Sequence, residues 1–424
     1  MDASGAQDRV NEPMEQEMTE GGIVWPKRAE ILYGAGMYTV LTTCPDYGSR
    51  NAGDRLIEVR LKDILEREKG DGDFVTIFRE EPLDQRLDEI NASRAVLLPG
   101  FAIRDLPIYP KAYRLADDLN RIRVPMIPVG ANWNTYPGDA QSRRELTYSE
   151  ASTSFLQRIA GQVEQFSCRE PFVCEILHRH GVTNTVLTGD PALFCLQRIG
   201  TGMKRPTRVD RLVFSPPLSP FYAKQATDVM AMLAQRFPAA RRFCAFHLLD
   251  ADTGNSERSE NSAAMSPEVA EKNRRIRDCA SELGYEILSL ASNFEGMLVY
   301  DDCDLHVGYE CHAHLYFLSV RIPSVLIAED ARGVGFNELI GIGGFNGFGR
   351  EKVARNVFQK PHTSGYCTTQ EELALAPPRT GLHTVIREFL DRECEREFGG
   401  YADVASLIDS LYESAMVPFI QGIP

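Results

Sequence analysis

The chain has 424 residues, and its 43% hydrophobic and 25% charged residues are ordinary proportions for a globular protein. This length predicts two or three domains of roughly 100–200 residues each. The formal net charge of −14 leaves no basic surplus for nucleic-acid phosphates, which argues against a nucleic-acid partner, and no apolar run reaches the ~18 residues of a transmembrane segment.

Residues 1–27 form an acidic and polar segment that we expect to be a disordered leader. The segment lacks the basic start and apolar centre of a signal peptide. The 10 cysteines are scattered and include no CxxC pair, so we expect reduced thiols and a cytoplasmic protein. The sequence indicates no cofactor and no metal site.

Short apolar runs then alternate with helical periodicity, the pattern of a parallel sheet with helices on both faces. The elements expected in the first half are strand 38–43, helix 55–69, strands 73–79 and 94–102, helix 112–123, strand 124–132, helix 154–165, strand 166–170, helix 171–181 and strand 184–193. A polar segment with Gly and Pro at 200–210 is a predicted linker.

The alternation restarts after this linker, with expected strands at 211–217, 242–250, 285–290, 303–309 and 324–330, and helices at 222–237, 267–283 and from 311. The sequence therefore predicts an α/β protein with two Rossmann-like domains, 28–205 and 206–345, that face a central cleft. Residues 346–424 are expected to be irregular before two amphipathic helices at 383–396 and 402–415, and part of this tail is expected to pack on the first domain. Ligands of such sheets bind beyond the carboxyl ends of the strands, so site residues should directly follow strands.

Two glycine-containing stretches follow predicted strands in this way. "NAGD" supplies Asn51, Gly53 and Asp54, either as a ligand-facing loop at a helix start or as a plain turn with Asp54 as the N-cap. "LLPGF" supplies Gly100, which lets the backbone approach a ligand or simply makes a turn.

Two charged residues occupy the same kind of position. Arg169 in "SCRE" offers a guanidinium fork for a carboxylate or phosphate, and the alternative is a surface charge patch with Glu170. Asp190 in "GDPA" ends a strand, where an ordinary N-cap is the alternative to a functional carboxylate.

The stretch "CDLHVGYECHAHLYFLSVRIPSVLIAED" (303–330) carries three histidines and two cysteines. In a helix that begins near Cys311, His312 and His314 point ~200° apart, so one metal ion cannot bind both. His314 is therefore expected in the core. His312, in the first helical turn after a strand, is a candidate acid, base or anion donor, with a structural role as the open alternative.

These motifs together resemble the polysaccharide pyruvyl transferase family over about residues 38–345. The matching positions are Asn51, Gly53 and Asp54; part of "LLPGF"; Ser167, Arg169 and Glu170; Asp190, Pro191 and Ala192; Asp304, Gly308, His312 and Ala313; Pro323; and the "EDARGVGF" region. The resemblance implies a two-domain, glycosyltransferase-B-like enzyme. Such an enzyme moves the pyruvyl group of phosphoenolpyruvate onto a sugar, usually as a cyclic ketal.

One position departs from the family. Glu310 stands where the family carries an arginine that is thought to hold the donor's phosphate and carboxylate together with the histidine. A carboxylate ~4 Å from a donor with about three negative charges costs several kcal/mol for each charge pair at an effective dielectric near 20. Either other cations compensate, with Arg169, Arg332 and His312 available, or the donor differs.

The leading hypothesis is pyruvyl transfer from an anionic donor such as phosphoenolpyruvate to a saccharide acceptor. The roles that this hypothesis gives are His312 as acid or phosphate donor, Asp190 or Glu310 as base, Arg169 as anion clamp, and Asn51, Gly53, Asp54, Gly100 and Arg332 as substrate-binding residues. One alternative is a transferase of the same scaffold with a nucleotide-sugar or other activated donor, in which Glu310 hydrogen-bonds a ribose or sugar hydroxyl. Another is a non-catalytic binding relative, and the acceptor's identity and assembly into homo-oligomers stay open.

Overall fold

The structure of the protein, a computed structural model, describes residues 36–44, 51–70, 72–104, 108–248, 267–291, 293–349 and 367–424. The leader predicted at residues 1–27 lies outside this part of the chain. None of the helices in the described part is both long enough and apolar enough to cross a lipid bilayer.

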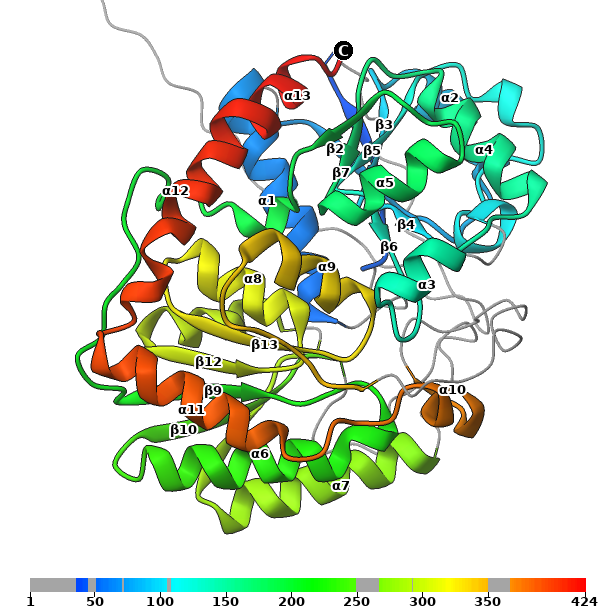
Figure 1. The fold of residues 1–424 in the computed structure, drawn as a ribbon. Helices are drawn as coiled ribbons and strands as arrows, with labels where there is room; N and C mark the ends of the chain where they lie inside the picture. Colours follow the sequence, from blue (N-terminus) through cyan, green and yellow to red (C-terminus); the bar gives the residue numbers. More distant parts are fainter. Residues whose placement is uncertain are drawn as a thin grey trace, which may run out of the picture. The chain divides into compact units, whose positions relative to one another are not determined.

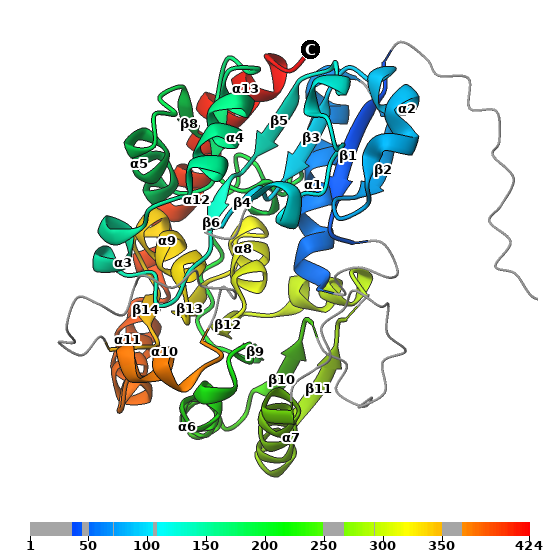
Figure 2. The ribbon, with the colours of Figure 1, turned by 90° about the vertical axis from the view of Figure 1, so that its right-hand side faces the viewer.

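The first sheet contains parallel strands in the order β2–β1–β3–β5, which follow one another across Figure 2. Their bounds are β2 Phe74–Phe78, β1 Tyr38–Thr42, β3 Val96–Pro99 and β5 Met126–Val129. Two short parallel pairs extend this region, namely β4 (Ala102–Ile103) with β6 (Asn132–Trp133), and β7 (Phe166–Cys168) with β8 (Thr185–Leu187). Its helices are α1 (Ala52–Lys69), α2 (Leu87–Asn91), α3 (Ala140–Glu145), α4 (Glu150–Ala160) and α5 (Pro171–Arg179).

The second sheet has six parallel strands in the order β11–β10–β9–β12–β13–β14. Their bounds are β11 Tyr285–Ser289, β10 Arg241–Phe246, β9 Arg211–Ser215, β12 Leu305–Gly308, β13 Ser324–Ala328 and β14 Gly344–Asn346. β12 and β13 are buried along their whole length, as expected for parallel strands covered on both faces. The strand order reverses between β9 and β12, and this reversal is where Rossmann-like sheets bind ligands.

Helices cover both faces of the second sheet (Figure 1). α6 (Ala223–Arg236) and α7 (Pro267–Glu282) lie on one face, and α8 (Cys311–Ser319) and α9 (Ala331–Ile340) lie on the other. The predicted α/β architecture, with two Rossmann-like sheets and added C-terminal helices, is confirmed.

The C-terminal segment contains α10 (Gln370–Leu375), α11 (Leu382–Glu395), α12 (Ala402–Leu411) and α13 (Val417–Gln421). This segment contacts both sheets. Tyr401 Oη donates to Ser324 O of β13 (2.7 Å), and Tyr38 Oη of β1 donates to Pro424 O (2.8 Å). The expectation that the tail packs on the first sheet is therefore confirmed. One hydrophobic cluster runs from α1 through the second sheet to these helices.

The prediction of a helix at 112–123 is wrong. Residues 113–118 form no helix, and Leu115 has a left-handed φ of 50°. Leu115 O instead accepts a hydrogen bond from Leu83 N (3.0 Å), and Asp118 caps a short turn at Leu119–Arg121. Tertiary burial of Tyr113 and Leu115 thus overrides the local helical pattern.

The cap of α1 also differs from the prediction. Asn51, and not Asp54, is the N-cap, and its side chain accepts a hydrogen bond from Gly53 N (2.8 Å). Asp54 lies in the first turn, where a negative charge is favourable next to the helix dipole.

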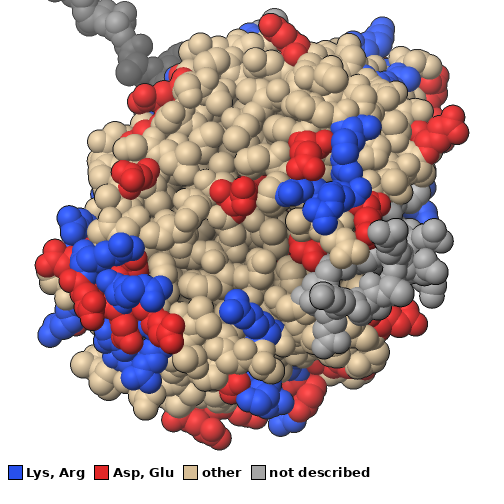
Figure 3. Space-filling model, viewed as in Figure 1, with Lys and Arg blue, Asp and Glu red and all other residues tan. Residues whose placement is uncertain are grey.

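On the face shown in Figure 3, charged side chains of both signs occur in small mixed groups.

Candidate functional site

Glu310 and His312 lie at the reversal point of the second sheet. Glu310 is the N-cap residue of α8, and its backbone N donates to Ser215 Oγ (3.1 Å) at the end of β9. This close approach explains Gly308, because a Cβ there would overlap Ser215. The two central strands of the sheet thus fix the loop that carries both candidate residues.

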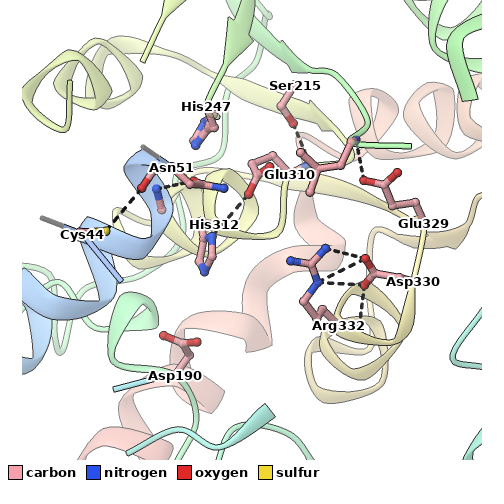
Figure 4. Close-up of polar contacts among 12 residues, drawn as sticks. Cys44, Asn51, Asp190, Ser215, His247, Glu310, His312, Glu329, Asp330 and Arg332 are labelled. Atoms are coloured by element: carbon pink, nitrogen blue, oxygen red, sulfur yellow. Dashed lines mark hydrogen bonds and ion pairs between the residues drawn. The ribbon is translucent and has the colours of Figure 1, made fainter. Parts of the chain in front are cut away.

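The Glu310 carboxylate points at the His312 ring (Figure 4). Glu310 Oε1 and His312 Nδ1 are 3.4 Å apart, which is long for a hydrogen bond but close for a pair of charges. Both residues are buried, with 7% of each exposed. Glu310 is therefore directed at a cation and not at open space.

The pair shifts both pKa values. Burial raises the pKa of Glu310, but His312, His247 and Arg332 outweigh burial and bring the pKa down from 4.5 to about 2. Burial lowers the pKa of His312, but Glu310, followed by Asp54 and Asp190, outweighs it, so the pKa lies above 6.5. The arrangement favours an ionised Glu310 next to an imidazolium at mildly acidic pH.

The first sheet supplies the other side of this site through the start of α1. A Cβ at Gly53 would overlap the His312 ring, so only glycine allows this contact. Ala52 N donates to His247 O (3.2 Å), which joins the same helix start to the end of β10. These contacts bring Asn51 and Gly53 close to His312, which lies more than 250 residues further along the chain.

A second cluster lies nearby and consists of Arg169, Glu170 and Asp190. Arg169 Nε donates to Glu170 Oε2 (3.0 Å), and an Arg169 terminal nitrogen lies 3.7 Å from Asp190 Oδ2. The three residues are almost completely buried, with Arg169 2% exposed. Burial, opposed by Arg169 and aided by Asp190, raises the pKa of Glu170 to about 7. Arg169 also stacks on the Phe336 ring of α9 at 4.4 Å, and Asp190 Oδ1 caps the turn at Ala192 N (2.9 Å).

Arg332 and Gly100 are placed differently. Arg332 forms a bidentate pair with Asp330, the N-cap of α9, at 3.1 Å and 2.6 Å. Its charge still acts on Glu310, so it lies within electrostatic reach of the site. Gly100 has a left-handed φ of 59° and packs against Ile57 of α1, and no contact joins it to His312.

The other histidines of the stretch 303–330, His306 and His314, belong to a buried hydrogen-bond chain. His306 Nε2 lies 2.8 Å from Ser215 Oγ, and its Nδ1 lies 2.7 Å from Ser324 Oγ, which also contacts His314 Nδ1 at 2.7 Å. Burial lowers the pKa of His306 well below 6.5 and that of His314 to about 3, so both rings are neutral. Across the described ranges, no group of three or more His, Cys, Asp or Glu is arranged to hold a metal ion.

Sequence reasoning missed several residues of this region. A small pocket next to Glu310 is lined also by His247 and Lys272, and by Pro216–Leu218 after β9. Burial lowers the pKa of Lys272 to about 8, and Glu329 and Glu310 oppose this effect. His247 directly follows the apolar run of β10, a signal that would have found it, whereas Lys272 lies within α7 and carries no such signal.

Two arginines were missed as well, although they carry the same signal. Arg79 directly follows β2, and Arg104 directly follows β4. Arg79 lies at the edge of the first sheet where β1 ends, because Arg79 N donates to Thr42 O (2.9 Å).

Solved structures similar to this chain include proteins seen with nucleotides. MnaA of S. aureus, in a co-structure with UDP, is 11% identical with a TM-score of 0.47, and the match covers 90% of this chain and 94% of that chain. HepE of Anabaena, in complex with UDP and glucose, is 12% identical with a TM-score of 0.45, and covers 91% and 97%. A UDP-GlcNAc 2-epimerase from Neisseria meningitidis, bound to UDP-GlcNAc, is 8% identical with a TM-score of 0.41, and covers 89% and 99%.

Among proteins with curated descriptions, none matches the sequence significantly. The family model described as polysaccharide pyruvyl transferase matches residues 51–331. This range begins at Asn51 and ends at Ala331, so it contains the Glu310–His312 pair and the Arg169 cluster. The chain therefore belongs to the polysaccharide pyruvyl transferase family.

Proposed function

We propose that this protein transfers a pyruvyl group from phosphoenolpyruvate to hydroxyl groups of a saccharide. The observation that carries this proposal is the buried Glu310–His312 pair beside the start of α1. Glu310 raises the pKa of His312, and this favours the protonated imidazolium that a general acid needs. Family membership supplies the reaction class.

In the proposed reaction, His312 gives a proton to the methylene carbon of the donor, and an acceptor oxygen attacks C2. The hydroxyl proton passes to a base, and Asp190 is the better candidate because Glu310, with a pKa of about 2, binds a proton weakly. The C2–O bond to phosphate then breaks, phosphate leaves with a proton, and a second hydroxyl attacks C2 and loses its own proton. The products are a cyclic ketal and inorganic phosphate.

Glu310 has a positioning role in this scheme. Its ionised carboxylate orients His312 and raises its pKa, and the neighbouring imidazolium offsets its repulsion of the donor. Arg169 holds Asp190 in place, since its guanidinium is engaged by Glu170 and Asp190 and is only 2% exposed. Asn51 and Gly53 shape the wall against which His312 rests.

A second candidate function is transfer from a nucleotide-sugar donor. The pocket beside Glu310, lined by His247, Lys272 and Pro216–Leu218, favours it, because it opens at the reversal point where Rossmann-like sheets bind nucleotides. In that case the Glu310 carboxylate would accept hydrogen bonds from ribose or sugar hydroxyls.

Ligand-dependent melting separates the two functions. A ligand present at 100 times its Kd stabilises the folded state by about 2.7 kcal/mol. We expect phosphoenolpyruvate to raise the melting temperature, and saccharides added with it to release inorganic phosphate. The His312→Asn variant should keep the melting temperature shift and release no phosphate, and His383→Asn, outside the site, serves as the matched control. Stabilisation by UDP or UDP-glucose alone would favour the second function, and stabilisation by none of these ligands would contradict both.

A further inference from the structure

Two arginines at the site lack the partners that the other cations have. Arg169 is paired with Glu170 and Asp190, Arg332 with Asp330, and His312 with Glu310. Within the described ranges, the guanidinium groups of Arg79 and Arg104 form neither an ion pair nor a hydrogen bond, and the Nε atoms of both are buried. Buried donors without acceptors are costly, and a bound anion would satisfy these two.

The Arg79 side chain packs on an aromatic ring, and hydrogen bonds to the backbone lie next to both arginines. The Arg79 guanidinium lies over the Tyr113 ring at 5.4 Å, and Arg79 O accepts from Arg114 N (3.1 Å). Ile103 O, directly before Arg104, accepts from Tyr148 Oη (2.9 Å). Among the described residues, neither guanidinium forms an ion pair with a carboxylate, and Asp54 acts on Arg104 only through its charge.

Electrostatics joins these arginines to the His312 site. Burial lowers the pKa of Arg104 to about 10, as do the charges of Arg79 and Arg332, while Tyr113 and Asp54 act in the opposite direction. Asp54 also raises the pKa of His312, so it lies within reach of both groups. Arg104 thus lies within electrostatic reach of two other guanidinium groups, and a negative charge bound beside it would relieve their repulsion.

We propose that Arg104 and Arg79 form a subsite for the phosphate or carboxylate group of an anionic ligand. This proposal deepens the proposed function, on which it rests for the identity of the ligand as the donor. Glu310 replaces the arginine of the family and repels an anionic donor. The two positive charges of the subsite compensate for this repulsion. The guanidinium forks are suited to bidentate binding of an oxyanion.

The test is Arg104→Gln, compared with the parent and with Arg208→Gln. Arg208 is an exposed arginine, paired with Asp210 and remote from the site, so its removal controls for the loss of one positive charge. Calorimetric titration with inorganic phosphate, phosphoenolpyruvate and UDP gives the Kd values. We expect Arg104→Gln to weaken binding of the preferred anion about tenfold to a hundredfold, with Arg208→Gln unchanged.

The melting temperature without ligand gives an independent readout. Arg104→Gln should melt at the same temperature as the parent or higher, because it removes a buried charge without a partner. A large fall would show that Arg104 serves folding and would overturn the proposal. If Arg104→Gln does not fold, Arg104→Lys keeps the charge but loses the fork, and anion binding equal to the parent would likewise overturn it.

The outcomes separate this subsite from the identity of the donor. If UDP or phosphate binds, phosphoenolpyruvate does not, and Arg104→Gln weakens that binding, then the subsite stands and the proposed donor fails. If phosphoenolpyruvate binds parent and Arg104→Gln equally, the donor stands and the subsite fails. If no anion binds the parent, both proposals fail.

Discussion

Replacing Glu310 by Gln removes the charge that raises the pKa of His312 and leaves the shape of the side chain almost unchanged. At 3.4 Å and an effective dielectric near 20, the attraction between the two charges is about 5 kcal/mol. Burial opposes it, and the lowering of the Glu310 pKa from 4.5 to about 2 corresponds to roughly 3 kcal/mol at about 1.4 kcal/mol per pH unit. We therefore expect the variant to lose up to roughly 3 kcal/mol of unfolding free energy.

The loss should depend on pH in a way that identifies the pair. The contribution of Glu310, whose folded pKa is lowered, is present above pH 4.5 and is lost as the pH falls towards 2. The contribution of His312, whose folded pKa is raised, is present below pH 6.5 and is lost as the pH rises through the folded pKa. The difference between parent and variant should therefore be largest between about pH 4.5 and 6.5 and should shrink on both sides.

Two measurements check this expectation. Urea unfolding from pH 3 to 9 gives the stability difference. NMR titration of the His312 ring gives its pKa, which should fall in Glu310→Gln because burial is then less opposed. Glu286→Gln is the control, since it removes an exposed carboxylate that is paired with Arg241. An unchanged His312 pKa together with a stability difference that is flat with pH would refute the reasoning.

Two further substitutions probe the surroundings of this pair. Gly53→Ala should lower the free energy of unfolding by about 1–3 kcal/mol and reduce product formation, because the added methyl overlaps the His312 ring. Melting and turnover measurements that match the parent would contradict this contact. Arg169→Gln should destabilise by about 3–5 kcal/mol because it leaves Glu170 and Asp190 buried without their cation. The loss of unfolding free energy caused by Arg169→Gln should be smaller at pH 5 than at pH 8, because Glu170, with a raised folded pKa of about 7, is protonated at pH 5. An equal loss at both pH values would count against this expectation.

The local pattern of the sequence determined the class of fold. Apolar runs such as "LHVG" and "SVLIA" are buried as β12 and β13, and the helix expected from residue 311 is α8. Position along the chain also indicated where chemistry lies, since Asn51, Arg169, Asp190 and His312 all follow strands. These are short-range features, because hydrophobic periodicity and turn residues act within a few positions of the chain.

The order of the strands, the partners of each charge and the burial of each side chain were decided only in the tertiary structure. Glu310 looks from the sequence like a repulsive substitution, yet it is oriented at His312, and Arg169 looks like a free anion clamp, yet two carboxylates engage it. Arg104 looks unremarkable, yet it lies within electrostatic reach of Arg79 and Arg332 and finds no hydrogen-bond partner for its buried Nε among the described residues. Ion pairing and burial depend on contacts between residues far apart in the chain, and no local pattern specifies which long-range contacts form.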